Sequence, residues 1–389
     1  MVPGVLTMPS PRVVTLRPEL APSIVLTAAV IAFFAVLTRP QVAAGPLPGG
    51  VVPDSYDYAY GAQSLLGGRY VVDWDGGAPR VPRYPPGFSV LLVPAVALGG
   101  VNAAVWVPYL MALLLGALGA ILATTLSGLV AAPLAAILLL LTPATADLAR
   151  LVMSDLPAAT LAVVELLLLC TGGRRRVVAA GAIAGALVWV RLASAPLIVA
   201  GVVGLTAYRQ WRRLALWYTL GALPALVALA AWQTTTFGSP VTTSYQAAGA
   251  SSNGRAEIQS FIAPQYLLGE PTSRDGEALS GAATRWRLPN LAVYPLELAG
   301  ADAFLSLPGV GLLGFIALSR YARRAGAPGV FGRFGVSCVA VTLGTYLPYF
   351  WQSARFFTIP AALLAIAAAA LFGELIGAVA RMLRRRSAR

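Results

Sequence analysis

The polar positions that border the long apolar segments of this sequence hold acids and arginines, but no histidine. Asp54 follows the first apolar segment and Asp155 begins a later one. Because histidine is absent, a His-based triad and an imidazole base are excluded, and a carboxylate is the available general base. Each acid also has a structural reading, as a helix cap or as a charge at the positive end of a helix. From the residues alone, the capping role and the role of general base both stay open for Asp54.

Arginines at the ends of apolar segments supply charge that would bind an anionic group. A planar guanidinium fork suits phosphate oxygens, whereas the alternative is a side chain that extends to lipid headgroups. The arginines closest to segment ends are Arg83, Arg191 and Arg355, with Arg80 and Arg150 as reserves. Three tyrosines are predicted to line the same site, and two of them recur at helical spacing: Tyr56, Tyr60 and Tyr84.

Composition places this chemistry in a membrane. Of 389 residues, 58% are hydrophobic and 11% are charged, whereas soluble proteins have roughly 25% charged residues. Repeated apolar runs of this length cross bilayers as helices, so the sequence predicts an all-α polytopic membrane protein. The net charge is +13 and the 28 basic residues are all arginine. They are dispersed in short loops, which indicates membrane topology and no nucleic-acid partner.

The apolar segments predict a single transmembrane domain, residues 1–389, with about ten spans. Several are shorter than the ~20 residues of a straight crossing, so kinked or partial spans are expected. The predicted spans are residues 21–38, 101–127, 130–143, 155–172, 177–190, 192–208, 214–235, 304–320, 333–350 and 356–380.

The arginines between the spans predict which side is cytoplasmic. If the spans alternate, five arginine-bearing segments fall on one side: Arg12 and Arg17, Arg174–Arg176, Arg209–Arg213, Arg320–Arg333 and Arg381–Arg386. The positive-inside rule then places both termini in the cytoplasm of a multi-pass plasma-membrane protein. A cleaved signal peptide ending near Ala43–Gly45 is the alternative for the first span, and a retained anchor is favoured.

Two long loops, residues 39–100 and 236–303, fall on the outward side. In the first, Asp54 or Ser55 is predicted to cap a helix that ends at Gly67–Gly68, and a second interfacial helix follows Pro85–Gly87. The other loop acids are read as capping or solvated groups: Asp57, Asp73 and Asp75. The second long loop is predicted to form a lid or a surface that binds an acceptor.

The motifs of the first loop resemble a known superfamily. They are Asp54–Tyr58, Ala62–Gly68 and Arg83–Phe88. Their order resembles the first outer loop of the GT-C glycosyltransferases. It is most similar to the bacterial branch of the dolichyl-phosphate-mannose protein mannosyltransferase superfamily, which includes the aminoarabinose transferases. Shorter matches are Leu151–Pro157, an acidic motif of the second outer loop, Phe237–Pro240, and Ala354–Pro360, an arginine–aromatic signature.

The resemblance implies a GT-C-like bundle and an inverting transfer of a sugar from a polyprenyl phosphate to a glycan, lipid or protein acceptor on the outward side. Direct displacement needs a base on the acceptor hydroxyl and stabilisation of the departing phosphate. By this resemblance Asp54 is the base and Arg355 the first candidate for the phosphate. Asp155 would orient the acceptor, or share a Mg²⁺ or Mn²⁺ ion with Asp54.

Two other classes of function stay open from the residues alone. A transporter or flippase of lipids or glycolipids would keep ionisable groups at mid-membrane, and here Glu165 is the main acid inside a span. Transporters also commonly have repeated halves, which this sequence lacks. A non-catalytic membrane scaffold is the third class, and it would survive a near-isosteric substitution of Asp54.

Overall fold

A computed structural model describes residues 21–40, 53–73, 76, 78–242, 264–269, 273–274, 281, 284 and 286–387. Several of the sequence predictions lie outside these residues: Arg12, Arg17, Ala43–Gly45, Asp75 and most of the predicted lid. Within the described residues the chain is helical apart from two short strands. These are β1 (Ser273–Arg274) and β2 (Trp351–Gln352), which pair in parallel.

Each of the ten predicted spans coincides with a helix. Five of the described helical stretches are long and apolar enough to cross a membrane: α1, η2 with α4, α10, α17, and η4 with α18. The prediction of an all-α membrane protein is confirmed. The helices are α1 (Ala21–Thr38), η2 (Val101–Val105) with α4 (Trp106–Ser127), α5 (Ala131–Leu140), α7 (Asp155–Thr171), α8 (Arg174–Val190), η3 (Leu192–Ser194) with α9 (Leu197–Leu205), α10 (Trp211–Phe237), α16 (Val310–Ala322), α17 (Gly326–Tyr346), and η4 (Ala354–Phe357) with α18 (Thr358–Ser387).

The predicted bounds of two of these helices were wrong. α16 begins only after Gly309, which has a left-handed φ of 77°, and α17 begins at Gly326, well before the predicted residue 333. From its charge, Arg333 was predicted to lie in a loop between two spans. In the structure its guanidinium lies inside α17 and donates to the carbonyl of Ala322 (2.9 Å) and the hydroxyl of Thr206 (2.9 Å). These bonds satisfy the charged group within the helical bundle.

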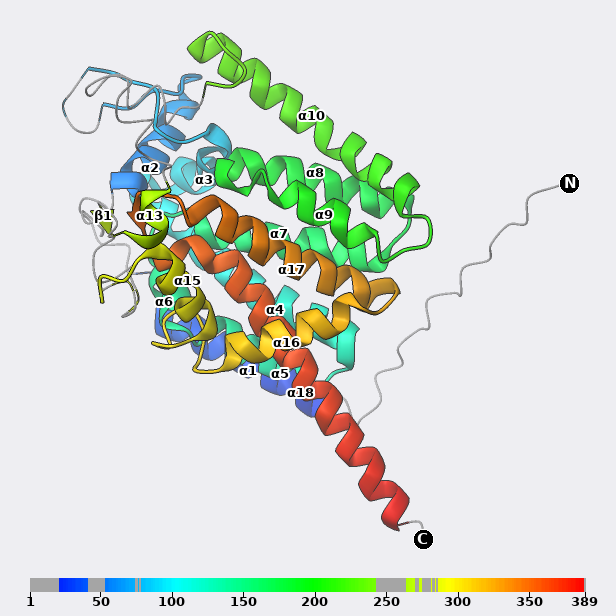
Figure 1. The fold of residues 1–389 in the computed structure, drawn as a ribbon. Coiled ribbons are helices and arrows are strands. Elements are labelled where there is room, and N and C mark those ends of the chain that lie inside the picture. Colours follow the sequence, from blue (N-terminus) through cyan, green and yellow to red (C-terminus); the bar gives the residue numbers. More distant parts are fainter. Residues whose placement is uncertain are drawn as a thin grey trace, which may run out of the picture.

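Small residues allow the helices of the bundle to approach closely. α8 packs against both α7 and α10, and α18 packs against α16, α5 and α4 (Figure 1). A Cβ at Gly181 of α8 would collide with the carbonyl of Tyr218, and one at Gly221 of α10 would collide with the carbonyl of Val178. Close backbone contact of this kind drives helix association in lipid. Similarly, residues 361–370 of α18 are buried, and most are alanine.

The first long loop contains the two predicted helices, α2 (Pro53–Leu66) and α3 (Pro86–Gly99). α2 ends at Gly67–Gly68, as predicted, because Gly68 adopts a left-handed φ of 74°. α3 begins against the end of α8, where Gly87 lies so close to the backbone of Trp189 that a Cβ would not fit. The loop is therefore packed against the bundle beside Arg191, the residue that follows α8.

The remaining described helices are α6 (Pro143–Leu148), α13 (Gln265–Leu268) and α15 (Asn290–Ala299), and α15 packs against α16 and η4. The Asn290 amide of α15 donates to the carbonyls of Tyr346 (3.4 Å), Leu347 (3.0 Å) and Tyr349 (2.8 Å), and accepts from Gln352 of β2 (2.9 Å). We call the end of the bundle that carries α2, α3 and η4 the site end, and the end with the turn at residues 323–325 the opposite end (Figure 1).

Candidate active site

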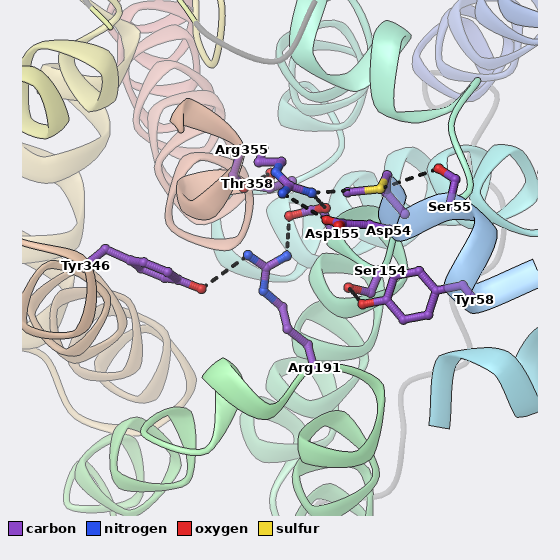
Figure 2. Close-up of polar contacts among 10 residues, drawn as sticks. Asp54, Ser55, Tyr58, Ser154, Asp155, Arg191, Tyr346, Arg355 and Thr358 are labelled. Carbon is purple, nitrogen blue, oxygen red and sulfur yellow. Dashed lines mark hydrogen bonds and ion pairs between the residues drawn. The ribbon is translucent and has the colours of Figure 1, made fainter. Parts of the chain in front are cut away.

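Four side chains from four separate elements meet at the site end (Figure 2). Asp54 lies in the first turn of α2, and Asp155 is the first residue of α7. Arg191 follows the last residue of α8, and Arg355 lies in η4, directly before α18. We call these four residues the acid–arginine cluster. The cluster contains four of the residues predicted from the sequence.

Arg355 bridges the two acids of the cluster. Its Nη2 donates to Oδ2 of Asp54 at 3.1 Å, and its Nη1 lies 3.9 Å from Oδ2 of Asp155. Arg191 forms a hydrogen-bonded ion pair with Oδ1 of Asp155. The side chains are 14% exposed for Asp54, 11% for Arg355, 14% for Arg191 and 1% for Asp155. Two carboxylates and two guanidinium groups therefore form a largely buried, electrically balanced cluster.

The capping roles considered for the two acids do not describe their contacts. The cap position before α7 is Ser154, and Asp155 is within the helix. The carboxylate of Asp54 instead accepts a hydrogen bond from Arg355, which lies 301 residues later in the chain. Both acids nevertheless lie in the first turns of their helices, near the positive end of the helix dipole.

Two aromatic side chains, Tyr346 at the end of α17 and Phe356 of η4, lie beside the arginines of the cluster. The Nη2 of Arg191 donates to the hydroxyl of Tyr346 at 3.3 Å. The Tyr346 ring stacks on Phe356 with centroids 4.3 Å apart, and the guanidinium groups of Arg355 and Arg191 lie 5.5 and 5.9 Å from the centroid of Phe356. Phe356 belongs to the arginine–aromatic motif, so it could be found from the sequence. Tyr346 is the last residue of an apolar helix and lies in no motif.

Tyr58 of α2, the tyrosine that ends the Asp54–Tyr58 motif, joins the first loop to α7. Its hydroxyl shares a 3.2 Å hydrogen bond with Ser154, and its ring stacks on Tyr84 at 4.6 Å. Burial raises the pKa of Tyr58 well above its ordinary value, despite the opposing hydrogen bond from Ser154. Tyr58 is therefore a neutral positioning group, and Tyr84 packs against it.

Asp57 was read as a capping or solvated acid, and that reading was wrong. The residue is 3% exposed. Its carboxylate accepts from the Arg80 guanidinium (3.3 Å) and from the backbone amide of Arg83 (3.1 Å). Distant partners of this kind could not be read from local spacing. Asp57 thus fixes the segment that carries Arg83 and Tyr84 beside α2.

The remaining predicted residues border the acid–arginine cluster less directly. Burial lowers the pKa of Arg83, but the nearby Tyr84, Asp54 and Asp57 outweigh this effect and give a net rise. Tyr56 and Tyr60 share one face of α2, as predicted, with ring centroids 6.3 Å apart. By contrast, the reserve residue Arg150 donates to the carbonyl of Leu37 (2.8 Å), which ties it to the end of α1.

An apolar cavity lies one helical turn from Arg355. Thr358, whose hydroxyl donates to the Arg355 carbonyl at 2.6 Å, lines it together with alanines of α18. The cavity is small, because a water-sized sphere has only about 20 Å³ in which to move. The other lining residues are Leu115, Leu138, Leu139, Thr142, Ala144, Thr145, Leu305, Ala361, Ala362 and Ala365. The polar cluster thus adjoins a space with mostly aliphatic walls.

The acid–arginine cluster does not fit a divalent cation. Mg²⁺ is usually held by one or two carboxylates together with waters and substrate phosphates. Here both carboxylates face guanidinium groups, which already supply the compensating positive charge and would repel a cation. Among the described residues, no group of three or more His, Cys, Asp or Glu residues lies close enough to share a metal. The geometry therefore does not favour the Mg²⁺ or Mn²⁺ ion considered for Asp54 and Asp155.

No protein-family model and no curated protein sequence matches this chain. Solved structures with the same fold include the archaeal oligosaccharyltransferase AglB from Archaeoglobus fulgidus, in complex with an inhibitory peptide and a dolichol-phosphate. The TM-score is 0.61 at 14% identity, over 96% of this chain and 52% of AglB. ArnT from Cupriavidus metallidurans, bound to undecaprenyl phosphate, has a TM-score of 0.55 at 19% identity, over 90% of this chain and 60% of ArnT.

A third similar structure is the Archaeoglobus fulgidus oligosaccharyltransferase in complex with Zn and sulfate, with a TM-score of 0.55 and 15% identity over 91% of this chain and 51% of that chain. AglB and ArnT are GT-C superfamily members. The GT-C-like fold expected from the first-loop motifs is therefore confirmed. The chain spans about half to three fifths of the length of these solved proteins.

Proposed function

We propose that the acid–arginine cluster is the active site of an inverting glycosyltransferase that uses a polyprenyl-phosphate-linked sugar. The observation that carries the proposal is the bridge made by Arg355 between Asp54 and Asp155. It gathers a candidate base and two phosphate-binding guanidinium groups in one largely buried place. The dolichol-phosphate and undecaprenyl phosphate bound by AglB and ArnT support a lipid phosphate as the substrate group.

The proposed reaction is a direct displacement. The acceptor hydroxyl gives its proton to the Asp54 carboxylate while its oxygen attacks the anomeric carbon from the side opposite the phosphate. The bond from that carbon to the phosphate oxygen breaks, and the oxygen keeps the electron pair. Arg355 and Arg191 stabilise the charge on the departing phosphate, and Asp155 orients the acceptor. No step passes through a metal ion.

We propose that the site end faces the extracytoplasmic side of a bacterial plasma membrane, as the arginine distribution predicts. The acceptor would be a glycan, a lipid or a protein. Glu165, the acid on which a transport function would rest, accepts a 2.7 Å hydrogen bond from Tyr218 and is buried.

The test is release of polyprenyl phosphate from a panel of polyprenyl-phosphate sugars, with purified protein and a mixed acceptor extract. We expect the wild type to release polyprenyl phosphate from at least one donor, and Asp54→Asn to release none above background. Glu374→Gln, which removes a carboxylate at the opposite end, is the matched control and should behave as the wild type. Full turnover by Asp54→Asn would refute the assignment of the base.

A further inference from the structure

The arginines assigned to the donor phosphate are already bonded to the acids of the cluster. Arg355 donates to Asp54, the candidate base, at 3.1 Å. The Arg191 guanidinium donates both to Asp155 and to the hydroxyl of Tyr346. The Tyr346 ring stacks on Phe356. The base and the phosphate therefore depend on the same cation, Arg355.

The charges of the transfer reaction change on both sides of Arg355. A sugar joined to a polyprenyl phosphate is a phosphodiester with one negative charge. The released polyprenyl phosphate is a monoester, which carries up to two charges because its second ionisation has a pKa of about 6. In the same step Asp54 accepts the acceptor proton and becomes neutral. One negative charge thus disappears at Asp54 while another develops at the phosphate.

We propose that Asp54 and the lipid phosphate compete for Arg355, which passes from the carboxylate to the phosphate during transfer. This inference rests on the proposed function and adds how the site is regulated. After transfer, Arg355 is retained by the doubly charged product because Asp54 is neutral. When Asp54 loses its proton to solvent, its carboxylate recovers Arg355 and the product is released. Product release is therefore coupled to the ionisation of Asp54.

The surroundings favour movement of the Arg355 side chain over movement of Asp54. The backbone of Arg355 is held by Thr358 at the start of α18, so a change of partner needs only side-chain rotation. The Asp54 side chain is 14% exposed, so its proton has a route to solvent. The charged or titratable groups that face Asp54 from neighbouring elements are Arg355, Asp155, Arg83, Tyr58 and Tyr349.

The test is equilibrium binding of undecaprenyl phosphate to detergent-solubilised protein. Asp54→Asn imitates the neutral base, so it should bind undecaprenyl phosphate about five-fold more tightly than the wild type, or better, as expected for linked equilibria. Arg355→Gln should bind about tenfold more weakly or worse, since it loses a charged hydrogen bond. In the double variant D54N/R355Q, the gain from D54N should vanish. Asp54→Ser replaces D54N if the latter fails to fold.

The binding results distinguish competition for Arg355 from simple charge repulsion between Asp54 and the phosphate. Tighter binding by D54N that disappears in the R355Q background supports the exchange of Arg355. Equal or weaker binding by D54N overturns it, while binding by the wild type still agrees with the proposed function. A gain that persists in the R355Q background also overturns it, because simple charge repulsion between Asp54 and phosphate would then explain the gain. A wild type that does not bind undecaprenyl phosphate would contradict the proposed function itself.

Discussion

Acids and arginines pair at both ends of the bundle, with opposite geometry. At the opposite end, Arg324 forms a two-point contact with Glu374 at 2.6 and 3.2 Å, and Arg320 lies 3.5 Å from the same carboxylate. This opposite-end cluster joins only α16 and its continuation to α18, and Arg324 is 34% exposed. At the site end, the shortest contact of Arg355 with an acid is 3.1 Å, and the four residues come from four elements.

The contacts of Glu374 are those of a structural ion pair. A two-point contact satisfies both partners, so the opposite-end cluster acts as a clamp between helices. In the acid–arginine cluster, Oδ2 of Asp155 is buried and has no hydrogen-bond partner among the described residues, only the 3.9 Å ion pair with Arg355. A buried carboxylate oxygen in this state is costly for stability alone, which favours a role in binding substrate.

The comparison predicts its largest effect at Asp54. Asp54→Asn should lower the transfer rate about 10²- to 10⁴-fold, because general-base catalysis contributes that much. Glu374→Gln should leave the rate unchanged. Initial rates with a donor found in the panel would measure both. Similar losses in the two variants would mean that both clusters only hold the helices together.

A smaller loss is expected when the charge of Arg191 is removed. Arg191→Gln should lower kcat/KM about 10- to 100-fold, since it removes a charged hydrogen bond to Asp155 and a contact for the departing phosphate. Arg324→Gln is the matched change at the opposite end, and steady-state kinetics of the two variants give the comparison. A loss confined to thermal stability would assign Arg191 a purely structural role.

Tyr346 tests whether the position of Arg191 is important. Tyr346→Phe keeps the stack on Phe356 and removes only the hydroxyl that accepts from Arg191. We expect a loss in kcat/KM of about tenfold or less, as for one hydrogen bond to a charged group. The control is Tyr321→Phe beside Arg324, where the ring lies 4.7 Å from the guanidinium. Equal kinetics in both variants would exclude a positioning role for Tyr346.

The sequence predicted the ten helical segments and named all four members of the acid–arginine cluster. Asp54, Asp155 and Arg355 lie in motifs that resemble a known fold, and Arg191 was named from its place at the end of an apolar segment. The sequence was not sufficient for Tyr346, which looks like any aromatic at a helix end until the chain folds. Asp57 was misread because its partners Arg80 and Arg83 lie more than 20 residues away. The start of α17 was predicted too late because hydropathy cannot show that the charge of Arg333 is hydrogen-bonded inside the bundle.

At the opposite end, only stability should respond to substitution. Glu374→Gln weakens a contact between side chains that are 21% and 34% exposed, so the expected cost is about 0–1 kcal/mol. Thermal melting in detergent should show a small decrease, with transfer intact. A decrease in transfer would contradict a purely structural role for Glu374, and the two ends of the bundle would then not differ in function.

Glu297 of α15 predicts a pH dependence of stability that is separate from transfer. Burial, with a further contribution from Asp302, raises the pKa of Glu297 to about 8 from 4.5. The folded protein holds this proton more strongly than the unfolded chain, so stability should fall as pH rises from about 4.5 to about 8. Melting temperatures between pH 5.5 and 8.5 should decline less steeply in Glu297→Gln. Parallel curves would assign the decline to other groups.

The contrast between the two ends is tested most directly by binding of undecaprenyl phosphate to Arg355→Gln and Arg324→Gln, measured side by side with the wild type. Each variant removes one guanidinium that is paired with an acid, and the two differ in the end of the bundle that they alter. We predict an affinity at least about tenfold lower for Arg355→Gln and unchanged for Arg324→Gln. Equal affinities in all three proteins would contradict a lipid-phosphate site at the acid–arginine cluster.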